Sequence, residues 1–305
     1  MKYKLAIRAS AIALIGAFLA ACDAPLEEYQ KFATAGKEYA NALDTLLVTS
    51  GNYFVDAQSE QLLRDDSVFA SLEESNKDRI DYMESNQSAD RWLQLIGQMR
   101  QHTDLVEQYF MALENLATSN TPAEAKDATD NIFSQLNAVS TKIKVNPLVS
   151  EPIALVLSQG TQIVLSEKIE GALREELEQR KEAIYRELAI QESVLQFLSI
   201  QLENDLKIIQ ESQDHRLLLQ PYVASEPITD PDEWIVKRRN FLTTKTSLEA
   251  LDNASQASQK LRKSFELLLE DKFTVERADA LLSDLNSLLD VAEELKKATN
   301  KPQEN

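Results

Sequence analysis

The sequence predicts an all-α protein, an elongated bundle of about six helices, two of them very long, with coiled-coil-like packing. Apolar residues recur at alternating spacings of three and four, which place them on one face of a helix. Only six of the 305 residues are glycines, and the eight prolines gather at a few places, so the segments between them are long. No stretch alternates apolar and polar residues as a half-buried strand would.

Two helices are predicted in the first 120 residues. The first runs from about 26 to 49, and Gly51 is expected to cap its C-terminus. The second runs from about 56 to 119 and has two adjacent apolar rows, wider than the seam of a two-stranded coiled coil, which favours a bundle of three or four helices. It would be about 90 Å long at 1.5 Å per residue unless the polar stretch 84–88 breaks it.

Two segments have the pattern of a helix N-terminus. Thr121-Pro122-Ala123-Glu124 and Asp230-Pro231-Asp232-Glu233 each combine a capping side chain, a proline suited to the first turn and a glutamate that can reach back. Between them, Pro147 and Pro152 interrupt the chain as either a hairpin or a kink. A further very long helix follows, and its apolar positions are Ile169, Leu173, Leu177, Ile184, Leu188, Leu195, Leu198, Leu202, Leu206 and Ile209.

The prolines Pro221, Pro227 and Pro231 predict an extended linker after Leu219. Residues 22–299 are expected to form one body, and a sub-boundary at 220–230 is the alternative. A helix from 231 to 270, a break at 271–274 and a final helix should form an antiparallel hairpin, and residues 300–305 a flexible tail.

The first 21 residues have the parts of a secretory signal. Three basic residues precede an apolar run from 9 to 18, which is about half of the roughly 20 residues that a spanning helix needs. We therefore expect a signal that is removed, with no membrane-spanning anchor at this position.

The run leads into Leu19-Ala20-Ala21-Cys22, which resembles the lipobox of bacterial lipoproteins. The resemblance implies that a diacylglyceryl group is attached to the Cys22 thiol, that residues 1–21 are cleaved off as the signal peptide, and that the freed amine is acylated, with palmitate-type chains. Cys22 is the only cysteine, so no intrachain disulfide can form. Two or three acyl chains anchor a protein stably, whereas one is marginal.

Charge and the residue after the lipobox restrict location and partners. The net charge is −18, and loss of the three basic side chains of the signal makes it −21. Such a chain repels phosphate backbones, so we expect no nucleic-acid partner. Asp23 resembles the inner-membrane retention signal of enterobacterial lipoproteins, which slightly favours the periplasmic face of the inner membrane over the outer membrane.

Few residues have the pattern of a catalytic or metal site. His102 lies in an apolar row beside Leu95 and Tyr109, which favours a partly buried structural histidine over a general base. His215 is expected near a helix end, where a cation is stabilised by the dipole. No metal-ligand spacing and no glycine-rich phosphate loop occurs. We therefore predict no catalytic residues, no metal and no cofactor.

These observations favour a non-enzymatic, lipid-anchored, periplasm-facing scaffold or protein-binding module of the cell envelope, with an envelope protein as partner and an oligomeric state that stays open. One alternative is a sensory module that holds a small molecule between helices near Trp92, His102 and Tyr109. A less favoured one is a membrane-perturbing protein that uses the apolar segment 153–165, although thirteen residues cannot span a bilayer.

Overall fold

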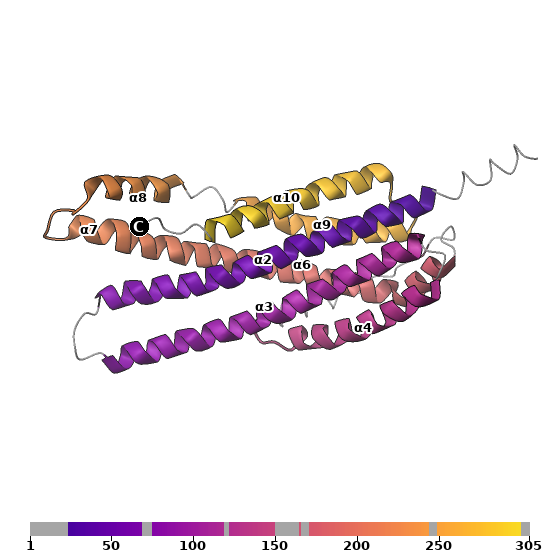
Figure 1. Ribbon diagram of the computed structural model, residues 1–305, viewed down its shortest axis with the longest axis horizontal. Helices are drawn as coiled ribbons and strands as arrows, with labels where there is room; N and C mark the ends of the chain where they lie inside the picture. The colour runs from indigo at the N-terminus through magenta and orange to yellow at the C-terminus, as the bar shows by residue number, and fades with distance from the viewer. Residues whose placement is uncertain are drawn as a thin grey trace, which may run out of the picture.

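The computed structural model describes residues 24–68, 75–118, 122–149, 165, 171–243 and 249–299, and confirms the all-α class, since these residues include no strand. Three helices, and not two, are longer than 40 residues. The described helices form an elongated bundle (Figure 1). In chain order they are α2 (Ala24–Val68), α3 (Ser75–Thr118), α4 (Pro122–Lys144), α6 (Gly171–Gln213), the π-helical segment η1 (Asp214–Leu219), α7 (Gln220–Val223), α8 (Pro231–Thr243), α9 (Glu249–Leu269) and α10 (Val275–Thr299).

The predicted boundary between the first two helices is wrong. Gly51 does not cap a helix, because α2 continues past it to Val68, and the next helix, α3, begins at Ser75 and runs unbroken through 84–88. Gly51 instead permits a close approach, since a Cβ there would lie 3.2 Å from Leu93 Cδ2. Two helices of roughly 66 Å therefore replace a shorter one and one of about 90 Å.

Helix α2 occupies the centre of the bundle and contacts α3, α6, α9 and α10. Near its start, the ring of Phe32 lies 5.7 Å from Phe110 of α3, 5.7 Å from Phe265 of α9 and 6.0 Å from Phe273. Further along, the hydroxyl of Tyr53 donates to the carbonyl of Leu295 in α10. The three–four stripe predicted for this helix is therefore its core-facing side.

Helices α4 and α6 run parallel. Thr129 contacts Glu176 and Ser140 contacts Glu187, and both hydrogen bonds join residues 47 apart. Residues 145–149 form turns after the end of α4, so the helix ends at Lys144, and the chain beyond 149, where the predicted hairpin or kink falls, lies outside the described residues up to α6 except for Leu165. The predicted N-terminus at Pro122 is confirmed.

The predicted extended linker is shorter than expected. Pro221 lies within a helical turn, because η1 and α7 continue α6 to Val223, and only residues 224–230 leave the helical conformation. A proline inside a helix removes one hydrogen bond and crowds the preceding turn, and the wider π-helical turn before Pro221 relieves that crowding. After this loop α8 begins as predicted, with the Glu233 amide donating to Asp230 Oδ1 at 2.9 Å.

The predicted helix from 231 to 270 is described as α8 and α9, and residues 244–248 lie outside the described chain. The break near 271 is confirmed: Asp271 has φ 57°, and the Lys272 amide donates to the Leu267 carbonyl, which closes the end of α9. Lys260 and Asp284, 2.7 Å apart, join α9 to α10 as the expected antiparallel hairpin.

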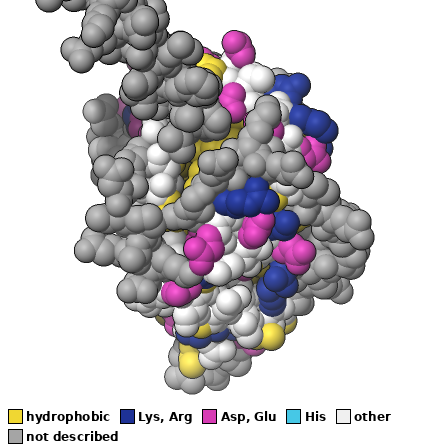
Figure 2. Space-filling model, turned by 90° about the vertical axis from the view of Figure 1, so that its right-hand side faces the viewer, with side chains coloured by type: hydrophobic (Ala, Val, Ile, Leu, Met, Phe, Trp, Pro, Cys, Tyr) yellow, Lys and Arg dark blue, Asp and Glu magenta, His cyan; other side chains and the backbone are white. Residues whose placement is uncertain are grey.

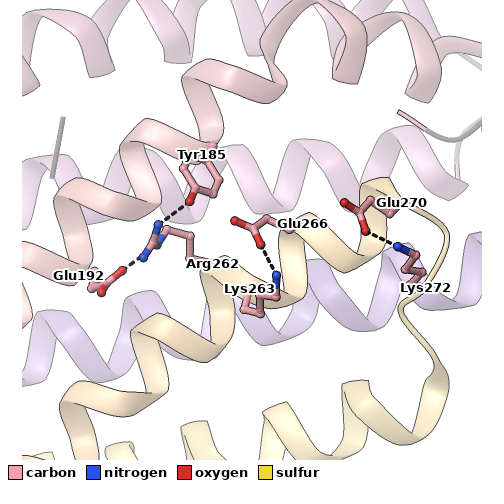
Figure 3. A network of polar contacts seen from close by, with 7 residues as sticks. All are labelled: Tyr185, Glu192, Arg262, Lys263, Glu266, Glu270 and Lys272. Atoms are coloured by element: carbon pink, nitrogen blue, oxygen red, sulfur yellow. Dashed lines mark hydrogen bonds and ion pairs between the residues drawn. The ribbon is translucent and has the colours of Figure 1, made fainter. Parts of the chain in front are cut away.

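A single arginine joins this hairpin to α6. Arg262 of α9 donates from Nε to Glu192 Oε2 at 2.7 Å and also to the Tyr185 hydroxyl, and its guanidinium lies 5.2 Å from the centre of the Tyr185 ring (Figure 3). Segments on both sides of the 224–230 loop therefore pack on the same long helix.

Candidate functional site

The expected lipidation and sorting residues, Cys22 and Asp23, lie outside the described residues, as do the rest of the signal, residues 153–164 and the tail 300–305. Helix α2 begins at Ala24, the second residue after Cys22. Figure 2 looks onto the end where α2 begins, where acidic and basic side chains alternate over the described surface. We call this end the proximal end.

His102 is part of a buried polar cluster that joins three helices. Its Nε2 lies 2.6 Å from Glu187 Oε2 of α6, and Ser140 of α4 donates to the same oxygen at 2.7 Å. Gln191 Nε2 lies 3.5 Å from His102 Nδ1. Burial raises the pKa of Glu187, but the hydrogen bonds from His102 and Ser140 outweigh it, so the pKa is lowered.

The geometry of this cluster is that of a structural contact between helices and differs from that of a catalytic triad. In a serine–histidine–carboxylate triad the histidine stands between the other two groups, whereas here Ser140 and His102 both contact the carboxylate. All three side chains are buried. The predicted structural role of His102 therefore fits its surroundings, and its burial is complete, not partial.

The space near Trp92, His102 and Tyr109 is filled by aromatic side chains. Trp92 stacks on Phe54 at 5.1 Å and lies 5.4 Å from Phe197. A cavity of about 10 Å³ beside Tyr109 and Glu187 has room for one water molecule. Burial raises the pKa of Tyr109, and its hydroxyl has no hydrogen-bond partner among the described residues.

His215 is not near a helix end as predicted. It lies in η1, inside a helical run that continues to Val223, and its carbonyl accepts a hydrogen bond from the Gln220 amide. The neighbouring Arg216 forms an ion pair with Glu60 of α2 at 2.8 Å. Gln213 Nε2 at the end of α6 also donates to Glu60 Oε1, at 3.1 Å, so Gln213 and Arg216 together link α2 to this region. The sequence did not indicate either contact.

A group of exposed apolar side chains lies at the opposite end of the molecule. We call α7, the 224–230 loop and α8 the distal tip, because they lie at the far end from the start of α2 (Figure 1). Tyr222 and Val223 are 69% and 66% exposed, and Leu219, Ile235 and Val236 are each nearly half exposed. In the sequence, this exposed surface is indicated by the apolar run Trp234 to Val236, because it lies in a helix that has no continuous apolar row at three–four spacing to bury it.

One tryptophan attaches α8 to the rest of the chain. Trp234 Nε1 donates to the Leu218 carbonyl of η1 at 3.2 Å, and its ring stacks on Tyr222 with 6.2 Å between ring centres. The Arg238 guanidinium lies over the Trp234 ring, 5.9 Å from its centre. The aromatic pair fixes the position of α8, and the adjacent apolar side chains remain in solvent.

Within the described ranges, no helix has the length and apolar character needed to cross a membrane. Over the same ranges, no three histidine, cysteine, aspartate or glutamate side chains are grouped so that they could hold a metal ion. No protein-family model, no characterised protein and no solved structure matches this chain.

Proposed function

We propose that this chain is a lipid-anchored, non-enzymatic scaffold or protein-binding module of the bacterial cell envelope that faces the periplasm. The observation that carries the proposal is the position of the lipobox cysteine, two residues before the central helix of an elongated bundle. A lipid at Cys22 would hold the proximal end at a membrane.

The shape of the bundle supports this role. Helix α6 with its continuation to Val223 is about 80 Å long, so the exposed apolar side chains of the distal tip stand far from the proposed anchor. Exposed aromatic and aliphatic groups that cluster in this way are typical of interaction surfaces.

The packing of the described interior favours this role over the sensory alternative. A drug-sized ligand needs a pocket of roughly 300 Å³ or more. The cavity beside Tyr109 has room for only one water molecule, and His102 contacts Glu187. The contacts of α3 and α4 with α6 surround this cavity and would have to separate before a ligand could enter it.

Metabolic labelling tests the anchor. Cells that express the full chain are grown with an alkyne-bearing palmitate analogue, and we expect label on the parent chain and none on Cys22→Ser, which should also retain residues 1–21. Fractionation of Asp23→Ser then tests sorting: a shift from the inner to the outer membrane supports the retention role. An unlabelled parent chain would contradict the proposed anchor.

Crosslinking in intact envelopes tests the binding role. We expect the parent chain to be recovered with a protein partner in constant ratio, and the ratio to fall when Cys22→Ser releases the chain from the membrane. Repeated recovery of the chain without any protein partner, its own copies included, would contradict a scaffold.

A further inference from the structure

The basic side chains of the distal tip already have partners within the chain. Lys237 forms an ion pair with Glu233 at 2.6 Å, and the Arg238 guanidinium lies over the Trp234 ring. Arg239 also has an interaction within the chain. These three side chains are the only lysines and arginines in the sequence of the tip, so its cations are all engaged.

Two carboxylates of the distal tip are not engaged in this way. Asp232 and Glu226 are exposed, and neither side chain forms an ion pair or a hydrogen bond with the part of the chain that the structure describes. A surface charge without a partner contributes little to folding, because water and salt screen it. Both carboxylates are therefore available to a cation of another molecule.

Asp232 shares the outer face of α8 with exposed apolar side chains. Ile235 and Val236 follow it at spacings of three and four, which places the three side chains on one face of the helix. Trp234, which contacts η1, lies roughly 160° around the helix from both Asp232 and Val236. Arg239 lies one turn further along the outer face, but it is one of the engaged cations. The available charge of this face is therefore negative.

The end of the preceding helical run has the same combination of groups. Tyr222 and Val223 are the most exposed apolar side chains of the tip, and Glu226 follows Val223 by three residues. Trp234 covers one side of the Tyr222 ring, with 6.2 Å between ring centres, and so brings this group next to α8. We call the combined group the tip surface, and its members are Tyr222, Val223, Glu226, Asp232, Ile235 and Val236.

We propose that the tip surface binds a basic amphipathic segment of a second protein of the envelope, a helix with one apolar row flanked by lysine or arginine side chains. The apolar row would cover the aliphatic and aromatic groups, and the flanking cations would pair with Asp232 and Glu226. The net charge of −18 favours the same partner at longer range, because it attracts basic segments and repels acidic ones. The inference rests on the proposed function and deepens it, since it gives the chemistry of the partner of a binding module.

Other occupants match the tip surface less well. A second copy of the chain, or an anionic membrane, would bring further negative charge to the two available carboxylates. Residues 69–74 contain two glutamates and no basic residue. The apolar segment 153–164 begins 18 residues before Gly171, which is roughly 63 Å when fully extended, whereas Tyr222 lies about 76 Å from Gly171 along the helix. A separate basic protein therefore fits best.

Peptide binding by the full chain tests the chemistry of the partner. The probe is a synthetic helix of leucine and lysine with leucine at positions i, i+3, i+4 and i+7, and it carries a fluorescent label. The lipidated chain is held in nanodiscs of neutral phosphatidylcholine, and empty nanodiscs give the background. We expect saturable binding in fluorescence anisotropy, at least roughly tenfold weaker in about 0.5 M than in about 0.05 M salt, because salt screens the charge pairs. A peptide with glutamate in place of lysine should not bind.

Matched variants test where the peptide binds. Asp232→Lys removes a carboxylate of the tip surface and Val236→Ser removes an aliphatic side chain, and we expect each to weaken peptide binding at least roughly fivefold. The controls are Glu203→Lys and Ile200→Ser on the body of α6, because these exposed residues are of the same types and lie three apart. Glu203→Lys changes the net charge by the same amount as Asp232→Lys, yet each control should alter the affinity less than about twofold. Circular dichroism checks that the helix content of each variant is unchanged.

Photo-crosslinking in intact envelopes tests the tip surface against natural partners. The full chain carries p-benzoylphenylalanine in place of Val236, and the crosslinked segment is identified by mass spectrometry. We expect a protein segment rich in apolar and basic residues, and we expect the crosslink to be lost when Asp232→Lys is also present.

Several results would overturn the inference. They are peptide binding that is absent, peptide binding that the control variants weaken as much as the tip variants do, and a crosslink from position 236 that is absent or goes to lipid, to a second copy or to an acidic segment. Palmitate labelling at Cys22 and recovery of a partner in constant ratio do not require the tip surface, so the proposed function can stand when this inference fails. An unlabelled Cys22 contradicts the anchor even where the peptide binds.

Discussion

Gly36 lies where α2 closely approaches α3. A Cβ at this position would lie 2.4 Å from Cγ of Phe110 and 2.5 Å from both Cδ atoms. Phe110 is fully buried, and Phe32 and Tyr109 border its ring, with ring centres 5.7 and 6.3 Å away. The ring therefore has no space to move aside, and Gly36→Ala should force α2 and α3 apart.

Two opposing effects determine how much Gly36→Ala changes the free energy of unfolding. Alanine is favoured over glycine inside a helix by about 1 kcal/mol, whereas one extra methyl in a packed core costs about 1–3 kcal/mol. The contacts at Phe110 are shorter than real Cβ contacts, which places the cost at the upper end. We expect Gly36→Ala to lower the free energy of unfolding by about 1–2 kcal/mol.

Urea unfolding followed by circular dichroism at 222 nm measures this change, and α3 supplies a matched control. Gly97 has nothing within 4 Å of an added Cβ, so Gly97→Ala should raise the free energy of unfolding by about 0.5–1 kcal/mol. Equal stabilisation by both substitutions would refute the close approach of the two helices. The cost of Gly36→Ala should shrink when Phe110→Leu is already present, since the two sites touch.

Three further predictions concern buried polar groups. Burial raises the pKa of Asp205 to about 7, so the folded chain binds that proton more tightly than the unfolded chain, and stability falls as the pH rises from about 4 to 7. Asp205→Asn should flatten this fall in urea titrations at pH 5 and 8, by about 3 kcal/mol at most; a slope equal to that of the parent would contradict the assignment. Glu187→Ala leaves His102 and Ser140 unpaired and should cost about 3 kcal/mol in thermal or urea unfolding, against less than about 0.5 kcal/mol for the exposed Glu203→Ala. Arg262→Met removes the contacts to Glu192 and Tyr185, so amide hydrogen exchange in α9 should accelerate while exchange in α3 stays unchanged.

Periodicity identified the core of α3 well. The sequence predicts apolar rows for this helix, and the residues that keep the three–four spacing are buried: Trp92, Ile96, Met99, Val106 and Phe110. This succeeds because a helix has a fixed period, so the identity of its neighbours does not alter which residues share a face.

Helix boundaries and contacts between helices were harder to predict, because the same residue type can serve more than one structural role. Gly51 can end a helix or let two helices approach, and only the position of Leu93 distinguishes these uses. Pro221 is tolerated in a helix because a π-helical turn precedes it, which no local pattern announces. The pairing of His102 with Glu187, 85 residues later, follows from the packing of α3 against α6, which spacing cannot reveal. The exposed apolar side chains of the distal tip were not predicted for the same reason, because exposure depends on whether other elements of the fold cover a helix.

The short distance between Cys22 and the start of α2 has a consequence for encounter rates. A module on a long flexible linker explores a large volume, so its effective concentration near a partner is low. Here a single residue, Asp23, separates Cys22 in the sequence from the central helix of the bundle. A lipid at Cys22 would therefore confine every tip to one thin layer at a common height above the membrane. A partner held in the same leaflet would be searched for in two dimensions, and a contact too weak to persist in dilute solution would be occupied there.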